Sequence, residues 1–384
     1  MRIVSALFVP LVVPGDVLRQ LSFATSGGPV CPQLQHLVWA ELHGWEHSQQ
    51  FLSSHLVSVF FWPCKVNIHA SLALASAISS IPTTRLEKLG LLGSTASTPP
   101  VRSALSGVVQ RLNTCFKKIY IRTSLSDAAW GHLASLPKLE SLRVTDTPSI
   151  EVSKSIPHEL TFPTLKHVTL ELSDQCQHLP VLFSLLKSSP LKEVVVEESS
   201  KVQHHVGIPT EVAFAILKAE LQRHINTLIF TEFYPADLTF VSHLGLFSSI
   251  KTLECRTRCL FSGECASPLT DSDIERLASG LPQLVTLTLG HICKYSPYNL
   301  TIKSMISLST HCLSLDSLRL SCDLTNISED VKVESGEPDP RLKAQSFCAL
   351  VSLDFRWLIK PKDPGALEIM ESALHRLFPR LGLT

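Results

Sequence analysis

Charged side chains are scarce in this chain, and no long apolar run accompanies that scarcity. Of 384 residues only 18% are Asp, Glu, Lys or Arg, and 34 positive charges balance 34 negative ones. A neutral chain has no general attraction for nucleic acid or anionic lipid, so neither is expected as a partner. No stretch of about 18 or more apolar residues occurs, which argues against a membrane-spanning helix. Apolar residues still make up 45%, and burial on both faces of a parallel sheet would accommodate them.

The familiar enzyme motifs are missing as well. The sequence holds no G-x-G-x-x-G after a strand, no P-loop, no G-x-S-x-G and no H-E-x-x-H. Each of these motifs places a phosphate, a nucleophile or a metal through its spacing. We therefore expect no enzymatic activity and no cofactor, while a catalytic site of unrecognised type stays an alternative.

Clusters of cysteine and histidine do not have the spacing of metal sites. The cysteine cluster lacks the spacing of a zinc knuckle or ribbon, so buried thiols are the simpler interpretation. One histidine pair could share a helical face, but no further ligand lies nearby, and the other pair falls in a loop where solvation explains it. No metal site is expected from these clusters: Cys255, Cys259 and Cys265; His43 and His47; His204 and His205.

The eleven cysteines are scattered and odd in number, which favours buried thiols over a disulfide framework. A reducing compartment, the cytoplasm or the nucleus, follows from that. A secreted protein is the alternative, because Arg2 precedes the apolar run Ile3–Val13 and two sequons begin at Asn299 and Asn326. Against secretion, two prolines interrupt the run and no A-x-A site follows closely. The simpler interpretation of residues 1–30 is a partial N-terminal repeat or cap.

What the sequence does contain is a repeated unit, clearest in Thr270–Gly290, TDSDIERLASGLPQLVTLTLG. Thr270 and Asp273 have the spacing of a capping box, and apolar residues then recur on one helical face. Gly280 is the expected helix stop in this pattern. An L-x-x-L-x-L strand follows, with its last two leucines on the same side. A unit this small cannot bury its own apolar side, so it must stack on similar neighbours.

The strand pattern returns along the whole chain at steps of roughly 23 to 35 residues. This spacing predicts an α/β leucine-rich-repeat solenoid over residues 31–384, a horseshoe with a parallel sheet on its concave face and irregular helices outside. Apolar strand positions are Leu34/Leu37, Val57/Val59, Leu86/Leu89/Leu91, Phe116/Ile119/Ile121, Leu139/Leu142/Val144, Leu165/Val168/Leu170, Leu191/Val194/Val196, Ile225/Leu228/Phe230, Ile250/Leu253/Cys255, Leu284/Leu287/Leu289, Leu315/Leu318/Leu320 and Leu350/Leu353/Phe355.

Helices are expected between several of these strands, and turn-rich loops between others. Expected helices start behind Ser126 and at Thr210, and a third precedes Leu315. The helix at Pro364, capped by Asp363, is expected to close the solenoid. Loops are expected at residues 93–100, 145–157 and 329–341.

Several segments resemble the leucine-rich-repeat region of fungal, basidiomycete-type F-box proteins. These are LSDAAWGHLASLPKLESLRV, LTDSDIERLASGLPQLVTLTLG, LSTHCLSLDSLRL and the ending LVSLDFRWL with DPGALEIMESALHRLFPRL. The resemblance covers roughly Cys31 to Leu381. It implies a non-catalytic scaffold whose repeats present a substrate to a ubiquitin ligase. In that family an F-box binds the Skp adaptor of a cullin ligase, but no F-box pattern occurs near Met1. Skp and cullin are therefore expected partners only if an F-box precedes this sequence.

The residues that alternate with the inward leucines define the predicted partner-binding face of the sheet. Arginine and aromatic side chains on such a face favour protein recognition, while ordinary solvated positions are the alternative. Charge along the face runs from basic, through acidic, to mixed. The predicted binding residues are Tyr120, Arg122, Arg143, His167, Glu171, Glu193, Glu197, Glu254, Arg256, Arg319, Asp354 and Arg356.

Overall fold

A computed structural model describes the fold over fourteen segments of the chain. They are residues 29–39, 49–61, 85–91, 99–122, 125–145, 161–172, 179–198, 208–233, 235–257, 269–290, 300–325, 352–353, 358–359 and 363–378, with isolated positions at 17, 20, 23, 24 and 76. The chain divides into two compact units, Met1–Leu165 and Lys166–Thr384. Both units combine helices with parallel strands, which confirms the predicted α/β class and the parallel sheet.

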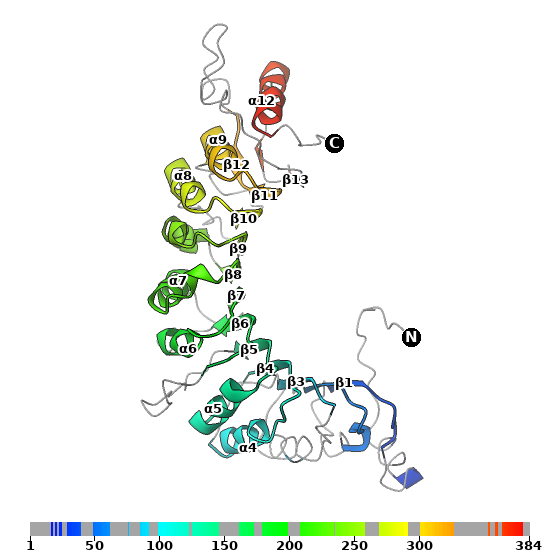
Figure 1. The fold of residues 1–384 in the computed structure, drawn as a ribbon. Coiled ribbons are helices and arrows are strands. Elements are labelled where there is room, and N and C mark those ends of the chain that lie inside the picture. The colour runs from blue at the N-terminus through cyan, green and yellow to red at the C-terminus, as the bar shows by residue number, and fades with distance from the viewer. Residues whose placement is uncertain are drawn as a thin grey trace. The chain divides into compact units, whose positions relative to one another are not determined.

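In the first unit, the described strands pair in parallel in the order of the chain, each joined to the next by a regular register. Helices α4 and α5 lie on one side of them (Figure 1). The strands are β1 (His36–Trp39), β2 (Ser58–Phe61), β3 (Lys88–Leu91), β4 (Lys118–Ile121) and β5 (Ser141–Thr145). The helices are the 3₁₀ turn η1 (Gln49–Phe51), α4 (Pro99–Val109) and α5 (Asp127–Ser135).

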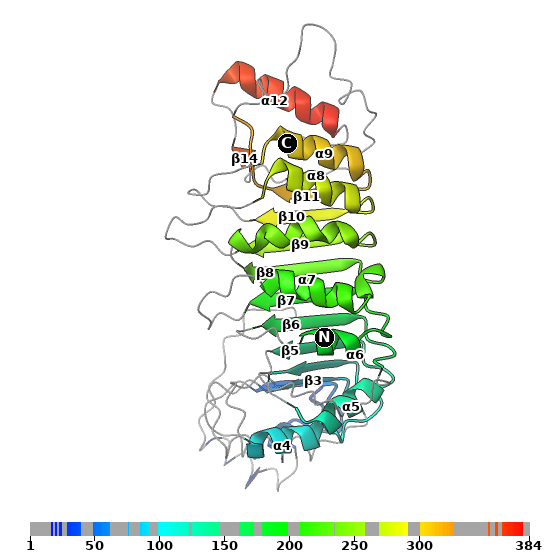
Figure 2. The same ribbon diagram turned by 90° about the vertical axis from the view of Figure 1, so that its left-hand side faces the viewer.

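The second unit repeats this arrangement, with its parallel strands again paired in chain order. Helices α6 to α9 lie on one side of β6–β11, as Figure 2 shows with α7, α8 and α9 stacked in front of the strands. The strands are β6 (His167–Leu172), β7 (Glu193–Glu198), β8 (Thr227–Phe233), β9 (Thr252–Thr257), β10 (Thr286–Gly290), β11 (Ser317–Leu320) and β13 (Ser352–Leu353).

Further elements of the second unit connect or extend these strands. A separate two-stranded parallel sheet, β12 (Cys322–Asp323) with β14 (Leu358–Ile359), had no signal in the repeat pattern. The helices are α6 (Leu179–Leu185), α7 (Ile208–Lys218), η3 (Leu221–Arg223), η4 (Pro235–Leu246), α8 (Asp271–Gly280), α9 (Ile302–His311) and α12 (Pro364–Leu377).

The core lies between the helices and the strands, and it is filled by the leucine-like positions of the strand pattern. Leu89, Ile119 and Leu142 are fully buried in the first unit, as are Leu253 and Leu287 in the second. Each such side chain contributes about 1.5–3 kcal/mol relative to leaving it exposed. Because strand side chains alternate, the same register that buries these residues turns their neighbours to the opposite face.

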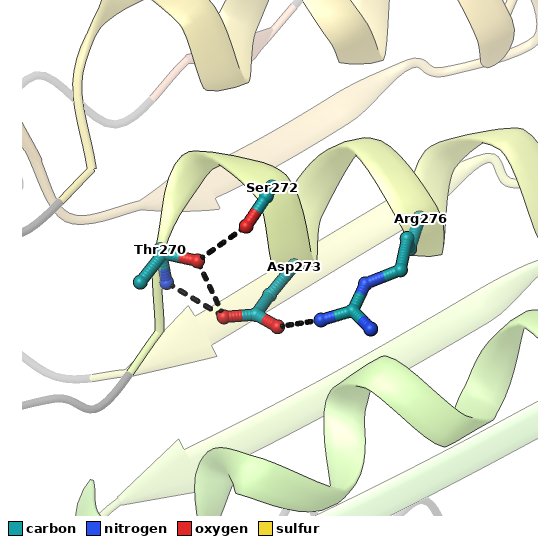
Figure 3. Close-up of polar contacts among 4 residues, drawn as sticks. All are labelled: Thr270, Ser272, Asp273 and Arg276. Carbon is teal, nitrogen blue, oxygen red and sulfur yellow. Dashed lines mark hydrogen bonds and ion pairs between the residues drawn. The ribbon is translucent and has the colours of Figure 1, made fainter.

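The start of α8 forms as the sequence predicts (Figure 3). Thr270 and Asp273 form the capping box, in which the Thr270 backbone N–H donates to Asp273 Oδ2 at 2.9 Å. Arg276 Nη2 donates to the other carboxylate oxygen at 2.6 Å. Burial of Asp273 acts to raise its pKa, but the hydrogen bonds from Thr270 and Arg276 outweigh burial, so the pKa of Asp273 lies below its usual value.

Gly280 is the last residue of α8, as predicted, but it is a close neighbour and not a special backbone conformation that requires glycine here. It does not adopt the left-handed conformation of a glycine cap; among the described glycines only Gly290, the last residue of β10, has a positive φ. Instead, Gly280 meets the backbone of Gly245 in η4. A Cβ built on Gly280 would lie 2.3 Å from Gly245 Cα and 2.5 Å from its carbonyl oxygen. The two helices can approach this closely only because Gly280 lacks a side chain.

Helix predictions succeeded where a cap was present. Ser126 caps α5, where its side chain accepts from Ala129 N, and Thr301 caps α9 by accepting from Lys303 N. Helix α12 begins at Pro364 as expected. Helix α7 begins at Ile208 rather than Thr210, since Pro209 fits the first turn, where no donor is needed.

Two α-helices and the 3₁₀ segments η1, η3 and η4 were not predicted, and one strand position was wrong. Helix α4 begins at Pro99, inside the loop expected over residues 93–100, and α6 was not anticipated. In β2 the buried pair is Val59 and Phe61, whereas Val57 precedes the strand and is only partly buried. Thr145, expected to begin the loop at 145–157, instead belongs to β5. The rest of that loop and the whole of the one at 329–341 lie outside the described residues.

Candidate interaction surface

The face of the β1–β5 strands opposite the core carries side chains in two straight rows. One row runs through Ser58, Lys88, Lys118 and Ser141, which are register partners on successive strands. The next row runs through Val38, Phe60, Gly90, Tyr120 and Arg143. Parallel strands lie about 4.8 Å apart, so neighbours within a row are close enough for direct side-chain contact.

The second of these rows is apolar at its centre. The rings of Phe60 and Tyr120 are in contact, with centroids 5.4 Å apart and a tilt of 55°. Gly90, on the strand between them, leaves the space that the Phe60 ring occupies, since a Cβ on Gly90 would fall 2.2 Å from Phe60 Cδ1. Val38 continues the row on β1 and is 46% exposed. Of these residues only Tyr120 was predicted. Alternation with the buried Val59 and Phe61 was the signal that could have identified Phe60.

Cationic side chains flank this apolar centre. Lys88 on β3 and Lys118 on β4 are register partners on adjacent strands, and they lie on one side of the row. Arg143 ends the row next to Tyr120, and Arg122 lies on the other side, where its Nε donates to Thr145 Oγ1 at 3.3 Å. The rows formed by the described strand residues of this unit contain no Asp or Glu.

One ion pair lies just before these strands. Lys117 Nζ donates to Glu87 Oε1 at 2.8 Å. This hydrogen bond, together with the charge of Glu87, raises the pKa of Lys117 above its usual value. The two residues of this pair immediately precede β3 and β4 and are therefore not part of the rows on the open face.

The corresponding face of the second unit is acidic in its first strands. Its three rows follow the register of β6–β11. Glu193 lies beside His167, with Oε2 at 3.3 Å from Nδ1, and Arg256 Nη2 lies 2.5 Å from Glu254 Oε2. The rows are His167–Glu193–Thr227–Thr252–Thr286–Ser317, Thr169–Val195–Ile229–Glu254–Thr288–Arg319 and Glu171–Glu197–Thr231–Arg256–Gly290.

Nine of the twelve predicted binding residues lie in these rows of the two units, and Arg122 directly follows β4 beside them. One of the nine differs in character from the prediction. Glu171 keeps its place beside Glu197 but is only 7% exposed, so a partner could reach little of it. Val195 and Ile229 lie in the middle row and were not chosen as binding residues. Asp354 and Arg356 lie outside the described residues.

The possible metal ligands fall mostly outside the described residues, as do both sequons. His43, His47, His204, His205, Cys259, Cys265, Asn299 and Asn326 are among these positions. Cys255 is a buried free thiol of β9, and burial, with a smaller effect of Glu254, raises its pKa well above the usual value. Within the described segments, no group of three His, Cys, Asp or Glu side chains could hold a metal ion.

Comparison with known proteins adds no family to this description. Neither a scan against protein-family models nor a search of curated proteins gives a match. Over the part of the chain that the structure describes, no helix has the length and apolar character needed to cross a bilayer.

Proposed function

We propose that this chain is a leucine-rich-repeat solenoid that acts as a non-catalytic protein-interaction scaffold, with the open sheet face as its binding surface. One observation supports this above the others. Parallel strands in regular register place one face under helices and leave arginine, tyrosine and glutamate side chains in rows on the other. Arginine and aromatic side chains supply much of the binding energy in protein interfaces, and a parallel sheet holds them in fixed positions.

The sheet face of the second unit is large enough to supply about half of one side of a standard protein interface. In the second unit, strands β6 to β11 and β13 span six intervals, or about 29 Å at 4.8 Å per interval. With a width of about 15 Å, that face amounts to roughly 450 Å², against about 800 Å² per partner in a standard interface. A partner of ordinary size must therefore contact more of the protein than this one face.

We further propose that the bound partner is a ubiquitin-ligase substrate, as the resemblance to F-box proteins implies. The free thiols favour a reducing compartment over the secreted alternative, because an exposed cysteine such as Cys31 would be prone to oxidation outside the cell. Skp and cullin would join through an F-box encoded upstream. Sequencing the 5′ end of the transcript tests that segment, and co-purification of Skp and cullin with the complete product tests the ligase role. Their absence would leave a binding scaffold without a ligase.

Direct binding measurements with matched variants test the scaffold itself. Partners are first captured with the full chain and then purified, so that affinity can be measured one partner at a time. Glu193→Gln alters the sheet face of the second unit, and Glu275→Gln makes the same chemical change on the exposed outer side of α8. We expect Glu193→Gln, or Tyr120→Ala in the first unit, to weaken binding at least about fivefold. Equal affinity for all sheet-face variants, with loss only in Glu275→Gln, would place the binding surface on the helices.

A further inference from the structure

The sheet face of the first unit combines an apolar centre with a cationic border. The centre consists of Val38, Phe60 and Tyr120, and the border of Lys88, Lys118, Arg122 and Arg143. These seven residues are called here the β1–β5 face. Interfaces with this layout derive most of their affinity from the aromatic centre, while the surrounding charges select the partner and steer its approach.

Repulsion between the two lysines of the β1–β5 face lowers the stability of the folded protein. Lys88 and Lys118 are direct register partners on neighbouring strands, and like charges in that position destabilise a sheet. Two acids precede strands of this unit: Glu87 is paired with Lys117, and the charge of Glu140 also acts on Lys117. A local arrangement that opposes stability is expected where it serves binding, since the repulsion is relieved when an anionic group of a partner lies between the lysines.

We propose that the β1–β5 face binds an extended, acidic peptide segment that also carries apolar side chains. The inference rests on the proposed scaffold function and specifies the chemistry of one partner. The apolar side chains lie against Phe60 and Tyr120, and carboxylates lie near Lys88 and Lys118 on one side and Arg122 on the other. The four intervals from β1 to β5 span about 19 Å at 4.8 Å each, a length that about six extended residues cover.

The geometry of the two rings favours a peptide over single-stranded nucleic acid. Base stacking needs a flat aromatic face open to the ligand. Phe60 is instead laid over Gly90 and packed at 55° against Tyr120, so the pair forms a compact apolar ridge. Leucine or phenylalanine side chains fit against such a ridge, and the neutral charge of the whole chain gives polyanions no wider attraction.

The test measures the affinity of the full chain for a labelled peptide of about eight residues in which Asp and Glu alternate with Leu and Phe, long enough to cross all five strands. Tyr120→Ala should weaken binding at least about tenfold. Lys118→Gln should weaken it about threefold and reduce its salt dependence. Gly90→Ala, which displaces the Phe60 ring without changing any charge, should also weaken binding. Lys138→Gln removes an exposed lysine of the same unit outside the face and should leave affinity unchanged.

Thermal unfolding of the same variants separates a binding role from a structural one. Lys118→Gln should be as stable as the parent protein or slightly more stable, because it removes the repulsion with Lys88. A variant that binds less while folding at least as well cannot be explained by damage to the sheet.

Three results would overturn the inference. The first is equal or tighter binding of a charge-reversed peptide with Lys in place of Asp and Glu. The second is tight binding of a single-stranded RNA of matched length together with weak binding of the acidic peptide. The third is no binding of the acidic peptide at about 1 mM, a concentration at which even a peptide with a binding free energy of only about 4 kcal/mol would be detected. Each of these leaves the scaffold function open, because that function is tested separately through Glu193 of the second unit.

Discussion

At the scale of single residues, the contact between Gly280 and Gly245 leaves no room for a side chain on Gly280. The atoms that a Gly280 Cβ would meet all belong to the Gly245 backbone, which cannot move aside as a flexible side chain can. The reverse substitution meets less resistance. A Cβ on Gly245 would lie 3.3 Å from the Arg276 carbonyl oxygen and 3.7 Å from Gly280 Cα.

We predict that Gly280→Ala lowers the free energy of unfolding by about 1–3 kcal/mol, the usual cost of overpacking, even though alanine favours a helix. Gly245→Ala should cost less. Gly107→Ala in α4 is the control, because the nearest atom to its added methyl group is 3.9 Å away. That control should gain about 0.5–1 kcal/mol from helix propensity. Denaturant unfolding measures all three, and a Gly280→Ala protein as stable as Gly107→Ala would contradict the close contact.

Asp273 predicts a defined pH dependence. Its pKa is lowered in the folded protein by the hydrogen bonds from Thr270 and Arg276, which outweigh the opposing effect of burial. The ionised carboxylate therefore stabilises the fold fully above the pKa of an unfolded aspartate, about 3.9, and this stabilisation is lost as pH falls through the lower folded value.

Asp273→Asn should accordingly cost about 0.5–2 kcal/mol at neutral pH, the range for losing a capping interaction. The difference between the two proteins should shrink as pH falls below about 4. Aspartate in the unfolded parent protein is then protonated, so folding must either release that proton or form α8 with a protonated, weaker cap. Unfolding curves at several pH values measure this. A difference that stays constant down to pH of about 2, or that grows, would show that the carboxylate charge does not stabilise α8.

At the scale of elements, adjacent repeats are joined by hydrogen bonds as well as by apolar contacts. Asp271, the first residue of α8, accepts from the start of α9 at three points. Thr301 N donates to Oδ1 at 2.9 Å, Thr301 Oγ1 donates to Oδ2 at 2.8 Å, and Ser304 Oγ donates to Oδ1 at 2.5 Å. One carboxylate thus orients the first turn of the next helix in the stack.

Asp271→Ala should therefore destabilise the second unit by about 1.5–3 kcal/mol, and Ser304→Ala by about 1 kcal/mol. The double variant should lose less than the sum, since the two residues share a hydrogen bond. A double-mutant cycle in denaturant measures the coupling. Ser279→Ala is the control, because its exposed hydroxyl donates only to Arg276 O within α8. Full additivity of Asp271→Ala and Ser304→Ala would contradict the link between helices.

Local signals in the sequence were sufficient for elements with a clear cap and strand pattern. The unit Thr270–Gly290 was predicted down to its capping box, and Ser126 located the start of α5. Helix α4 was missed because Pro99 and Pro100 resemble a turn, although proline also fits a first helical turn. Helix α6 is only seven residues long, too short for a helical period to stand out.

Properties set by neighbouring strands could not be predicted. The burial of Glu171, the approach of Gly280 to Gly245 and the placement of Phe60 over Gly90 all depend on residues more than twenty positions away. Alternation within one strand indicates which side chains share a face, but the register with the next strand decides what each of them meets.

At the scale of the whole molecule, a neutral sequence conceals two faces of opposite character. The described face of the first unit carries lysine and arginine around an aromatic centre, while the first strands of the second unit carry Glu171, Glu193 and Glu197. The neutral net charge predicted no preference for charged partners. The order of the strands nevertheless places cationic side chains on the face of the first unit and glutamates on the first strands of the second. The single solenoid over residues 31–384 and the F-box kinship stay predictions.

The central claim is that partners bind the open sheet face rather than the helices. Site-specific photo-cross-linking tests it most directly, with a photoreactive residue in place of Thr286 on β10 or of Ser279 on the exposed side of α8 in the same repeat. We predict a cross-link to the purified partner from Thr286 and none from Ser279. A cross-link from Ser279 alone would contradict the claim.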